Sequence, residues 1–171
     1  MSPATSSVQH TLQDITATAT LGRQLGQIAQ KGDIILLHGD LGVGKTTLTQ
    51  FIAQGLEVPK DQYVSSPSFA LMHEYLGRLP LFHMDCYRLS GEEDIEGAGL
   101  AEYIGGPGLT LIEWPDRLGS LQPQERLDLT LKAVNETTRI CLLQPHGDSW
   151  ASRIATLSSR LALTRPNSRN L

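Results

Sequence analysis

Residues 39–46 read Gly39-Asp-Leu-Gly-Val-Gly-Lys45-Thr46 and fit the phosphate-binding pattern G-x-x-x-x-G-K-[ST]. The short apolar run at residues 34–38 predicts a strand that leads into this stretch. Residues 47–55 after it predict a helix that ends at a C′ glycine, Gly55. A strand, a glycine-rich loop and a helix in that order are the context that the pattern requires. The stretch therefore predicts a nucleoside triphosphate site in an α/β fold.

The residue types of this loop suit a polyphosphate. The glycines keep the backbone N–H groups open to phosphate oxygens, and the following helix adds the positive end of its dipole. Lys45 is placed to contact the β- and γ-phosphates, which gives it a catalytic role as well, and the Thr46 hydroxyl is placed to bind Mg²⁺. The nucleotide-binding residues that the motif predicts are Gly39, Asp40, Leu41, Gly42, Val43, Gly44, Lys45, Thr46 and Thr47.

Length and charge restrict the class of protein. A chain of 171 residues, of which 40% are hydrophobic, is expected to form one domain with a single core. The net charge of −4 argues against a broad basic face for nucleic acid. Between Asp85 and Asp116 there are eight acidic residues and one basic residue, Arg88. This segment is either a surface for a basic protein partner or an ordinary solvated face.

The remaining composition points to an intracellular setting. Cys86 and Cys141 are the only cysteines, and their spacing supports neither a zinc site nor a disulfide framework. Residues 1–7 are polar and lack the apolar stretch of a signal peptide. No apolar run approaches the length of a membrane span. We therefore expect a cytoplasmic protein without a membrane association.

The pattern along the chain predicts a P-loop NTPase-like, three-layer sandwich with a central, largely parallel sheet and an antiparallel extension. We expect residues 1–10 to be disordered, residues 11–147 to form the ATPase domain, and residues 148–171 to form a C-terminal helix and a basic tail. The expected helices are 16–30, 47–54, 94–104 and 150–163, and the expected strands are 34–38, 69–76, 79–85, 109–112, 126–134 and 138–144.

Two acidic residues follow apolar strands and are candidates for the γ-phosphate and its metal. Ligands of open α/β sheets lie at the carboxyl ends of the strands. Glu113 follows the strand at residues 109–112, so its carboxylate is expected near Thr46, where it would bind Mg²⁺. Asp85 ends the other apolar run and is a second candidate. One acid on the metal and one on the attacking water would suit ATP hydrolysis.

Other nucleotide-binding classes fit less well. The chain has no N-K-x-D stretch of the kind that reads guanine in GTPases. A small-molecule kinase usually carries several arginines in a mobile lid, but residues 60–125 contain only Arg78, Arg88 and Arg117. An ATPase is therefore favoured over a kinase.

The combination of motifs resembles a known family. The loop at residues 39–47, then Ser66-Pro-Ser-Phe69, His83-Met-Asp-Cys-Tyr-Arg88 and Leu111-Ile-Glu-Trp114 are similar, in that order and spacing, to the TsaE/YjeE family over roughly residues 12–144. The family consists of small bacterial ATPases that are needed for the threonylcarbamoyladenosine modification of tRNA. The resemblance implies ATP and Mg²⁺ as cofactors and the other modification proteins as partners, with tRNA met only indirectly.

The resemblance also implies roles for individual residues. Asp85 matches the family's second essential carboxylate, which makes it the predicted catalytic residue beside Lys45, and Glu113 matches the metal acid. Ser66-Pro67-Ser68 resembles a switch-like loop, although the family usually has Thr where this chain has Ser68. Arg139 matches a basic residue that lies against the nucleotide, and an exposed strand arginine is the alternative.

A second class of function stays open. The chain is either an ATPase or a nucleotide-gated binding module in which ATP orders residues 65–69 and turnover is incidental. Slow intrinsic hydrolysis is expected in both cases, because the sequence contains no obvious arginine finger.

Overall fold

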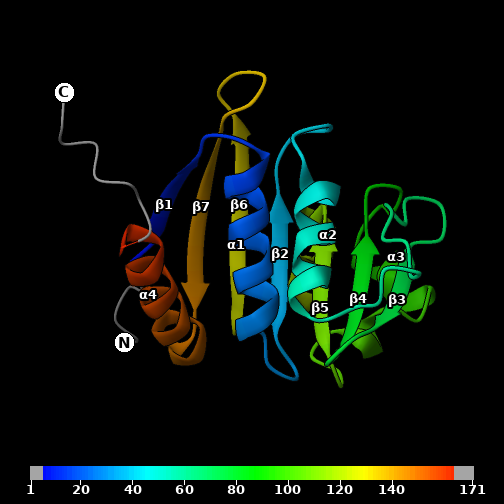
Figure 1. The fold of residues 1–171 in the computed structure, drawn as a ribbon. Coiled ribbons are helices and arrows are strands. Elements are labelled where there is room, and N and C mark those ends of the chain that lie inside the picture. The colour runs from blue at the N-terminus through cyan, green and yellow to red at the C-terminus, as the bar shows by residue number, and fades with distance from the viewer. Residues whose placement is uncertain (1–5, 164–171) are drawn as a thin grey trace, which may run out of the picture.

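A seven-stranded sheet organises the chain in the computed structural model, which describes residues 6–163 (Figure 1). Its strands are β1 (Val8–Leu12), β2 (Ile34–His38), β3 (Met72–Leu76), β4 (Pro80–Asp85), β5 (Leu109–Glu113), β6 (Arg126–Ala133) and β7 (Arg139–His146). The helices are α1 (Ile15–Ile28), α2 (Lys45–Gly55), α3 (Glu92–Gly97) and α4 (Asp148–Leu163), with two 3₁₀ helices, η1 (Ala101–Tyr103) and η2 (Pro115–Leu121).

The sheet has a parallel centre and antiparallel edges. The strand order is β1-β7-β6-β2-β5-β4-β3, and the central neighbours β6, β2, β5 and β4 are all parallel to one another. At one edge β3 pairs with β4 in the antiparallel direction, and at the other edge β7 and β1 continue the sheet in antiparallel steps. The predicted fold class is confirmed. All parallel strands therefore end at one rim, where the loop before α2 begins.

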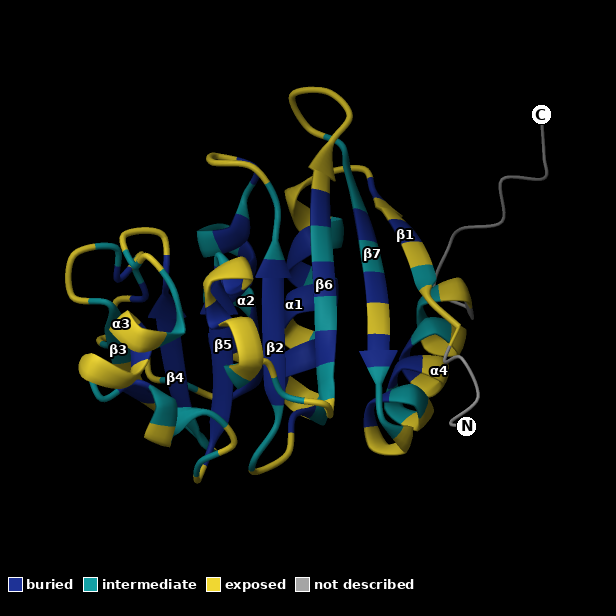
Figure 2. Ribbon diagram, turned by 180° about the vertical axis from the view of Figure 1, so that it is seen from behind, coloured by how far each residue is buried: buried dark blue, intermediate teal, exposed yellow. Residues whose placement is uncertain are grey.

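Helices cover the two faces of the sheet unequally. Helices α1, α2 and α4 lie on one face, and α3 with the 3₁₀ helices lies over the other face beside β4 and β5 (Figures 1 and 2). Strand β2 is buried on both faces, since Ile35 and Leu37 belong to the larger core cluster and Ile34 and Leu36 to the smaller one. Burial on both faces explains why its sequence is a continuous apolar run rather than an alternating one.

Helices α1 and α2 approach each other closely because glycines lie in their interface. A Cβ on Gly26 would lie 2.1 Å from the carbonyl oxygen of Ile52, and one on Gly55 would lie 2.1 Å from that of Arg23. No larger residue fits at either position. The prediction that Gly55 is a C′ glycine was wrong, because Gly55 lies inside α2 and the left-handed residue after the helix is Glu57, with φ 62°. Contact with α1, rather than helix termination, explains this glycine.

The N-terminal segment differs from its prediction. Residues 8–10 were expected to be disordered, but they begin β1, whose residues Val8 to Leu12 pair with Leu143 to Arg139 of β7. His10 and Leu12 are buried while Gln9 and Thr11 are exposed, so the strand has one side toward the core. The pairing joins chain segments more than 120 residues apart, and local periodicity carries little sign of it. Residues 1–5 and the predicted basic tail at 164–171 lie outside the described residues.

The helix predicted at residues 94–104 is broken in two. Helix α3 ends at Gly97, and η1 forms only at Ala101. Gly99 lies between them at φ +73°, a conformation that ends a right-handed helix.

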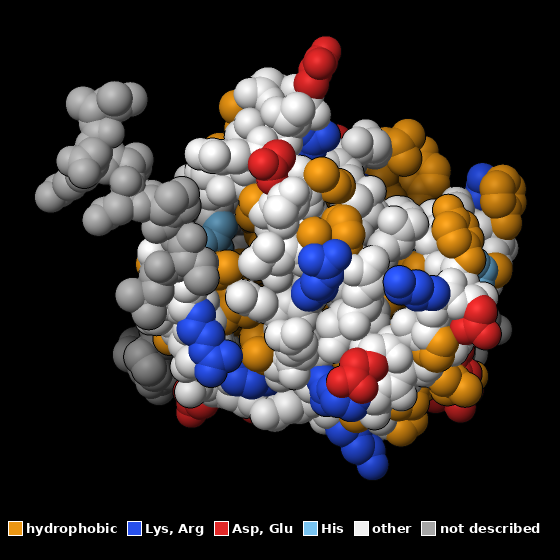
Figure 3. All heavy atoms as spheres, in the orientation of Figure 1, with side chains coloured by type: hydrophobic (Ala, Val, Ile, Leu, Met, Phe, Trp, Pro, Cys, Tyr) orange, Lys and Arg blue, Asp and Glu red, His pale blue; other side chains and the backbone are white. Residues whose placement is uncertain are grey.

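The face formed by α1, α2 and α4 has a mixed surface. Lys and Arg side chains are scattered there among neutral and apolar atoms (Figure 3). Within residues 6–163, no helix has both the length and the apolar character that crossing a membrane requires.

Candidate functional site

The loop between β2 and α2 has the backbone of a phosphate-binding loop. Gly42 and Gly44 have φ values of +77° and +116°, and a Cβ at either position would meet no atom within 4 Å. The glycines are therefore needed for their conformation and for the space that they leave open. No side chain caps the N-terminus of α2. Its first N–H groups, with the positive end of the helix dipole, are oriented to receive an anion.

The side chain of Lys45, the first residue of α2, reaches back to the start of the phosphate loop. Its Nζ atom donates hydrogen bonds to the carbonyl oxygens of Gly39 at 2.6 Å and Asp40 at 3.1 Å, and lies 4.5 Å from the ring centroid of Trp114. Burial lowers the pKa of Lys45, while the carboxylates of Glu113, Asp85 and Asp40 act in the opposite direction. The lysine thus lies between the phosphate loop and the carboxylates. Thr46, half-buried, follows it in the same helical turn.

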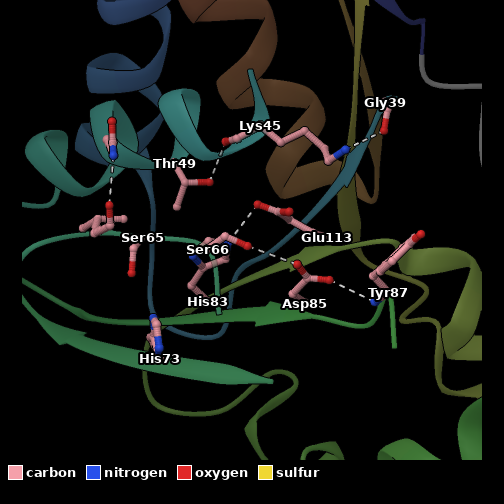
Figure 4. A network of polar contacts seen from close by, with 12 residues as sticks. Gly39, Lys45, Thr49, Ser65, Ser66, His73, His83, Asp85, Tyr87 and Glu113 are labelled. Atoms are coloured by element: carbon pink, nitrogen blue, oxygen red, sulfur yellow. Dashed lines mark hydrogen bonds and ion pairs between the residues drawn. The ribbon is translucent and has the colours of Figure 1, made fainter. Parts of the chain in front are cut away.

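Asp85 and Glu113 are cross-strand neighbours. They pair in register at the carboxyl ends of the parallel strands β4 and β5, and both are 3% exposed. Figure 4 shows Lys45 approaching from α2 while both carboxylates come from the sheet below it. Within the described part of the chain, neither carboxylate forms an ion pair with a lysine or an arginine. The structure therefore brings together three of the residues that the sequence predicted.

Each carboxylate is held by donors from nearby backbone and side chains (Figure 4). Oδ1 of Asp85 accepts a hydrogen bond from the backbone N–H of Tyr87 at 2.9 Å, and Oδ2 accepts one from the Ser66 hydroxyl at 3.3 Å. Oε1 of Glu113 lies 3.0 Å from Nε2 of His83. These contacts orient both acids.

The predicted switch-like loop contacts the site through its serines. Besides the bond from Ser66 to Asp85, the hydroxyl of Ser68 lies 3.4 Å from Nε of Arg88. The guanidinium of Arg88 also lies over the ring of Phe69, which is 85% exposed. The loop is thus joined both to Asp85 and to Arg88.

The side chain of Arg139 contacts the backbone of the phosphate loop. Its Nε donates to the carbonyl oxygen of Val43 at 2.8 Å, and its other nitrogen contacts are carbonyls of the hairpin between β6 and β7. Direct contact between Arg139 and a nucleotide stays a prediction. The structure adds a second way for it to act, by holding the loop.

Two residues of the site were not assigned by sequence reasoning. Trp114 lies beneath Lys45 and has left-handed backbone angles, φ 57° and ψ 52°, immediately after Glu113. His83 contacts Glu113 and is 0% exposed. The signal that could have found His83 is its spacing of two from Asp85, because alternate residues of a strand lie on the same face.

The two cysteine thiols of the chain are not reactive groups. Cys86 and Cys141 are buried and free. Burial raises the pKa of each thiol to about 12, and the Asp85 charge adds to the effect at Cys86. Both are therefore protonated and poorly nucleophilic at neutral pH.

A hollow adjoins the phosphate loop. It has a volume of about 710 Å³ and is lined by residues 37–43, 114–116 and 130–133. Lys45, Asp85 and Glu113 are not among its lining residues. The hollow therefore extends the site beyond the buried carboxylates instead of containing them.

The donor set fits Mg²⁺ better than a transition metal. No group of three or more His, Cys, Asp or Glu side chains in residues 6–163 could hold a metal ion by itself. Two buried carboxylates, neither of them paired with a lysine or an arginine in the described part of the chain, match with the Thr46 hydroxyl the oxygen ligands that Mg²⁺ takes alongside phosphate oxygens and water. The residues present thus fit a cation that arrives with a nucleotide.

Comparisons with known proteins find similar sequences and a similar fold. A family model described as "Threonylcarbamoyl adenosine biosynthesis protein TsaE" matches residues 12–141. The tRNA threonylcarbamoyladenosine biosynthesis protein TsaE of Bacillus subtilis is 41% identical over 123 residues, covering 71% of this chain and 75% of that protein. The protein of the same name from a Nostoc species is 37% identical over 150 residues, covering 85% of this chain and 90% of that protein.

A solved structure shares the fold. The crystal structure of Bacillus subtilis YdiB superposes with a TM-score of 0.76 and 31% sequence identity. The match covers 91% of this chain and 96% of that chain, so the similarity extends through almost the whole of both molecules.

Proposed function

The chain belongs to the TsaE family, and from that membership we propose that it is a Mg²⁺-dependent ATPase that serves the threonylcarbamoyladenosine modification of tRNA. One observation carries the proposal. Asp85 and Glu113 are paired in register at the rim of the sheet, buried, and electrostatically coupled to Lys45 at the start of α2. Two buried acids beside a phosphate loop are the groups that hydrolysis of a triphosphate needs.

Each residue has a distinct role in this proposal. Lys45 exchanges its carbonyl partners for the β- and γ-phosphates, whose charge it neutralises. The hydroxyl of Thr46 and the carboxylate of Glu113 would hold Mg²⁺. Bound there, the ion would neutralise phosphate charge in the transition state. Asp85, which Tyr87 holds through its backbone N–H, orients the attacking water or accepts its proton.

The partners follow from the family and from the surface. Relatives are named for tRNA threonylcarbamoyladenosine biosynthesis, and this chain is proposed to act in a complex with the other proteins of that modification in the cytoplasm. The net charge of −4 and the mixed surface support contact with tRNA through those proteins instead of directly.

The experiment that tests the proposal measures phosphate release from ATP by the purified chain, alone and with the partner proteins, over a range of Mg²⁺ concentrations. Glu113→Gln and Thr46→Ala should each lower Mg²⁺-dependent turnover by about 100-fold, the scale of removing a transition-state charge contact. Each should leave nucleotide binding in EDTA within a few-fold of the unmodified chain. Lys60→Ala, an exposed lysine outside the site, is the control. Turnover that needs no Mg²⁺ and neither side chain would overturn the assignment.

A nucleotide-gated binding module is the second candidate. The observation that favours it is the hydrogen bond from Ser66 to Asp85, which joins the switch-like loop to one of the two carboxylates of the site. In that case nucleotide binding moves the loop and thereby changes partner affinity, and hydrolysis is incidental. Substitution of Asp85, described in the Discussion, separates the two candidates.

A further inference from the structure

His83 lies beneath the carboxylate that we assign to the metal. It occupies β4 two residues before Asp85, so both side chains lie on the face of the sheet that α2 covers. Its register partner on β5 is Leu111, two residues before Glu113. The imidazole is 0% exposed, and its Nε2 atom lies 3.0 Å from Oε1 of Glu113. One strand therefore carries both a carboxylate and the ring that contacts the neighbouring carboxylate.

In the hydrogen bond between His83 and Glu113, the histidine is the donor. An ionised carboxylate can only accept hydrogen bonds, so the proton shared with Glu113 belongs to Nε2 of His83. The opposite ring atom, Nδ1, is buried and has no hydrogen-bond partner in the described part of the chain. A buried polar atom without a partner costs free energy, which an apolar residue at this position would avoid. The hydrogen bond that Nε2 donates to Glu113 therefore explains why a histidine, and not an apolar residue, occupies this position.

The hydrogen bond from His83 restricts the orientation of the Glu113 carboxylate. A glutamate side chain rotates about three bonds, and ordering it costs conformational entropy. Within residues 6–163, the contact with His83 is the hydrogen bond that the structure shows for this carboxylate, and it is made by Oε1. The second oxygen is then left for a cation. Buried groups that orient ligand carboxylates in this way commonly change metal affinity by about 10- to 100-fold.

We propose that His83 is a positioning residue that holds the Glu113 carboxylate in its Mg²⁺-binding orientation. The inference rests on the proposed function, since it assigns a role to His83 within the same site. It goes beyond that function because it predicts that Mg²⁺ affinity depends on a residue that contacts neither the ion nor the nucleotide. His83 acts only through Glu113, so it should affect the benefit that Mg²⁺ gives to nucleotide binding and not nucleotide binding itself.

Two amides of different length provide a matched pair of variants. Gln places its amide nitrogen near the position of Nε2, whereas the shorter Asn places it near Nδ1, so only His83→Gln can still donate to Glu113. Calorimetry with the non-hydrolysable analogue AMP-PNP, in EDTA and in Mg²⁺, gives the ratio of the two affinities. We expect His83→Asn to lower this ratio by about tenfold or more and His83→Gln to stay within about threefold, with affinity in EDTA unchanged in both.

The outcomes separate this inference from the proposed function. If Glu113→Gln lowers the ratio and His83→Asn does not, or if both amides lower it equally, His83 does not position the carboxylate. If Glu113→Gln leaves the ratio unchanged, the metal assignment itself fails. A measurement on the unmodified chain remains decisive if a variant does not fold. Nitrogen NMR should show His83 protonated on Nε2, with a resonance that shifts when Mg²⁺ is added to the AMP-PNP complex, and an unshifted resonance overturns the proposal.

Discussion

The ammonium group of Lys45 lies 2.6 Å from the carbonyl oxygen of Gly39, so the lysine at the end of the phosphate loop contacts the first residue of the loop. The same ammonium lies over the ring of Trp114 and near two buried carboxylates. The loop is therefore held in a closed shape by a charge that a phosphate can take over. In the proposed function, phosphate binding exchanges these carbonyl partners for phosphate oxygens.

Lys45→Met should weaken ATP binding by at least about tenfold. The apolar side chain keeps the packing on Trp114 but lacks the positive charge that contacts the phosphates in the proposed function. Calorimetry measures the affinity, and thermal unfolding checks that the variant is folded. Lys60→Met, at an exposed position, is the matched control. An affinity equal to that of the unmodified chain, in a folded variant, would show that the lysine does not contact the nucleotide.

Asp85→Asn separates an ATPase from a passive switch. Asparagine can still accept from the Tyr87 N–H and contact Ser66, but it cannot orient or deprotonate water as a carboxylate does. We expect ATP affinity to stay within about threefold and turnover to fall by roughly 100-fold or more, measured by phosphate release. Glu102→Gln, an exposed acid, should change neither quantity.

The same variant is informative in a reconstituted tRNA-modification reaction. If Asp85→Asn binds ATP and supports repeated cycles of modification at the normal rate, hydrolysis through Asp85 is not the mechanism. The nucleotide-gated module would then be the better description.

Arg139→Ala should weaken ATP and ADP to the same extent, by about three- to tenfold. The reason is that its bond to the Val43 carbonyl holds the loop that binds the phosphates common to both nucleotides. Calorimetry with the two nucleotides measures the effect. A loss confined to ATP would instead show that the guanidinium contacts the γ-phosphate.

Helix α3 offers a defined test of the acidic surface. Glu92 accepts hydrogen bonds from Ser120, and Asp94 accepts one from the Ser90 N–H, so both hold local structure. Glu93 and Glu96 are exposed. If the acidic segment meets a basic partner, reversing both charges to lysine should slow association by roughly tenfold at low salt, with a smaller effect at high salt.

The control for this surface is Glu125→Lys, at an exposed position just before β6. Association rates with the partner proteins, measured by surface plasmon resonance at two salt concentrations, give the comparison. Rates that are the same for all variants would return this helix to the class of ordinary solvated faces.

Asp128 should make folding stability depend on pH. Burial by itself raises its pKa, but the hydrogen bond with His38 and the charges of Arg126, His38 and His146 outweigh burial and lower the pKa. A carboxyl group with a lowered folded-state pKa adds stability above its unfolded pKa, and this stability is lost as the pH falls through the lowered value. The loss is therefore expected below about pH 4.

Asp128→Asn should accordingly lower the free energy of unfolding by about 1–2 kcal/mol at neutral pH, and the difference from the unmodified chain should shrink in acid. Denaturant unfolding at several pH values measures it, with the exposed Asp61→Asn as the control. A difference that is constant from pH 7 to pH 2 would exclude a role for the charge.

The phosphate loop, the strand before it, the helix after it and the α/β class could all be predicted from the sequence. These features depend on local conformation. Gly42 and Gly44 are needed because of their own backbone angles, and β2 reads as a strand because residues 34–37 are buried on both faces. Glu113 and Asp85 were predicted for a related reason, since a polar residue that follows an apolar run marks the end of a buried strand.

The order of the strands in the sheet and their register could not be predicted from the sequence and are known only from the fold. The pairing of β1 with β7, the position of Asp85 opposite Glu113, and the contacts from His83 to Glu113 and from Arg139 to Val43 all join distant parts of the chain. Residue periodicity reports how each segment is buried, but it does not report which other segment buries it. Which strands pair depends on packing summed over the whole sheet. For that reason the phosphate loop could be predicted from eight consecutive residues, whereas the proposed role of His83 in positioning Glu113 could not be predicted.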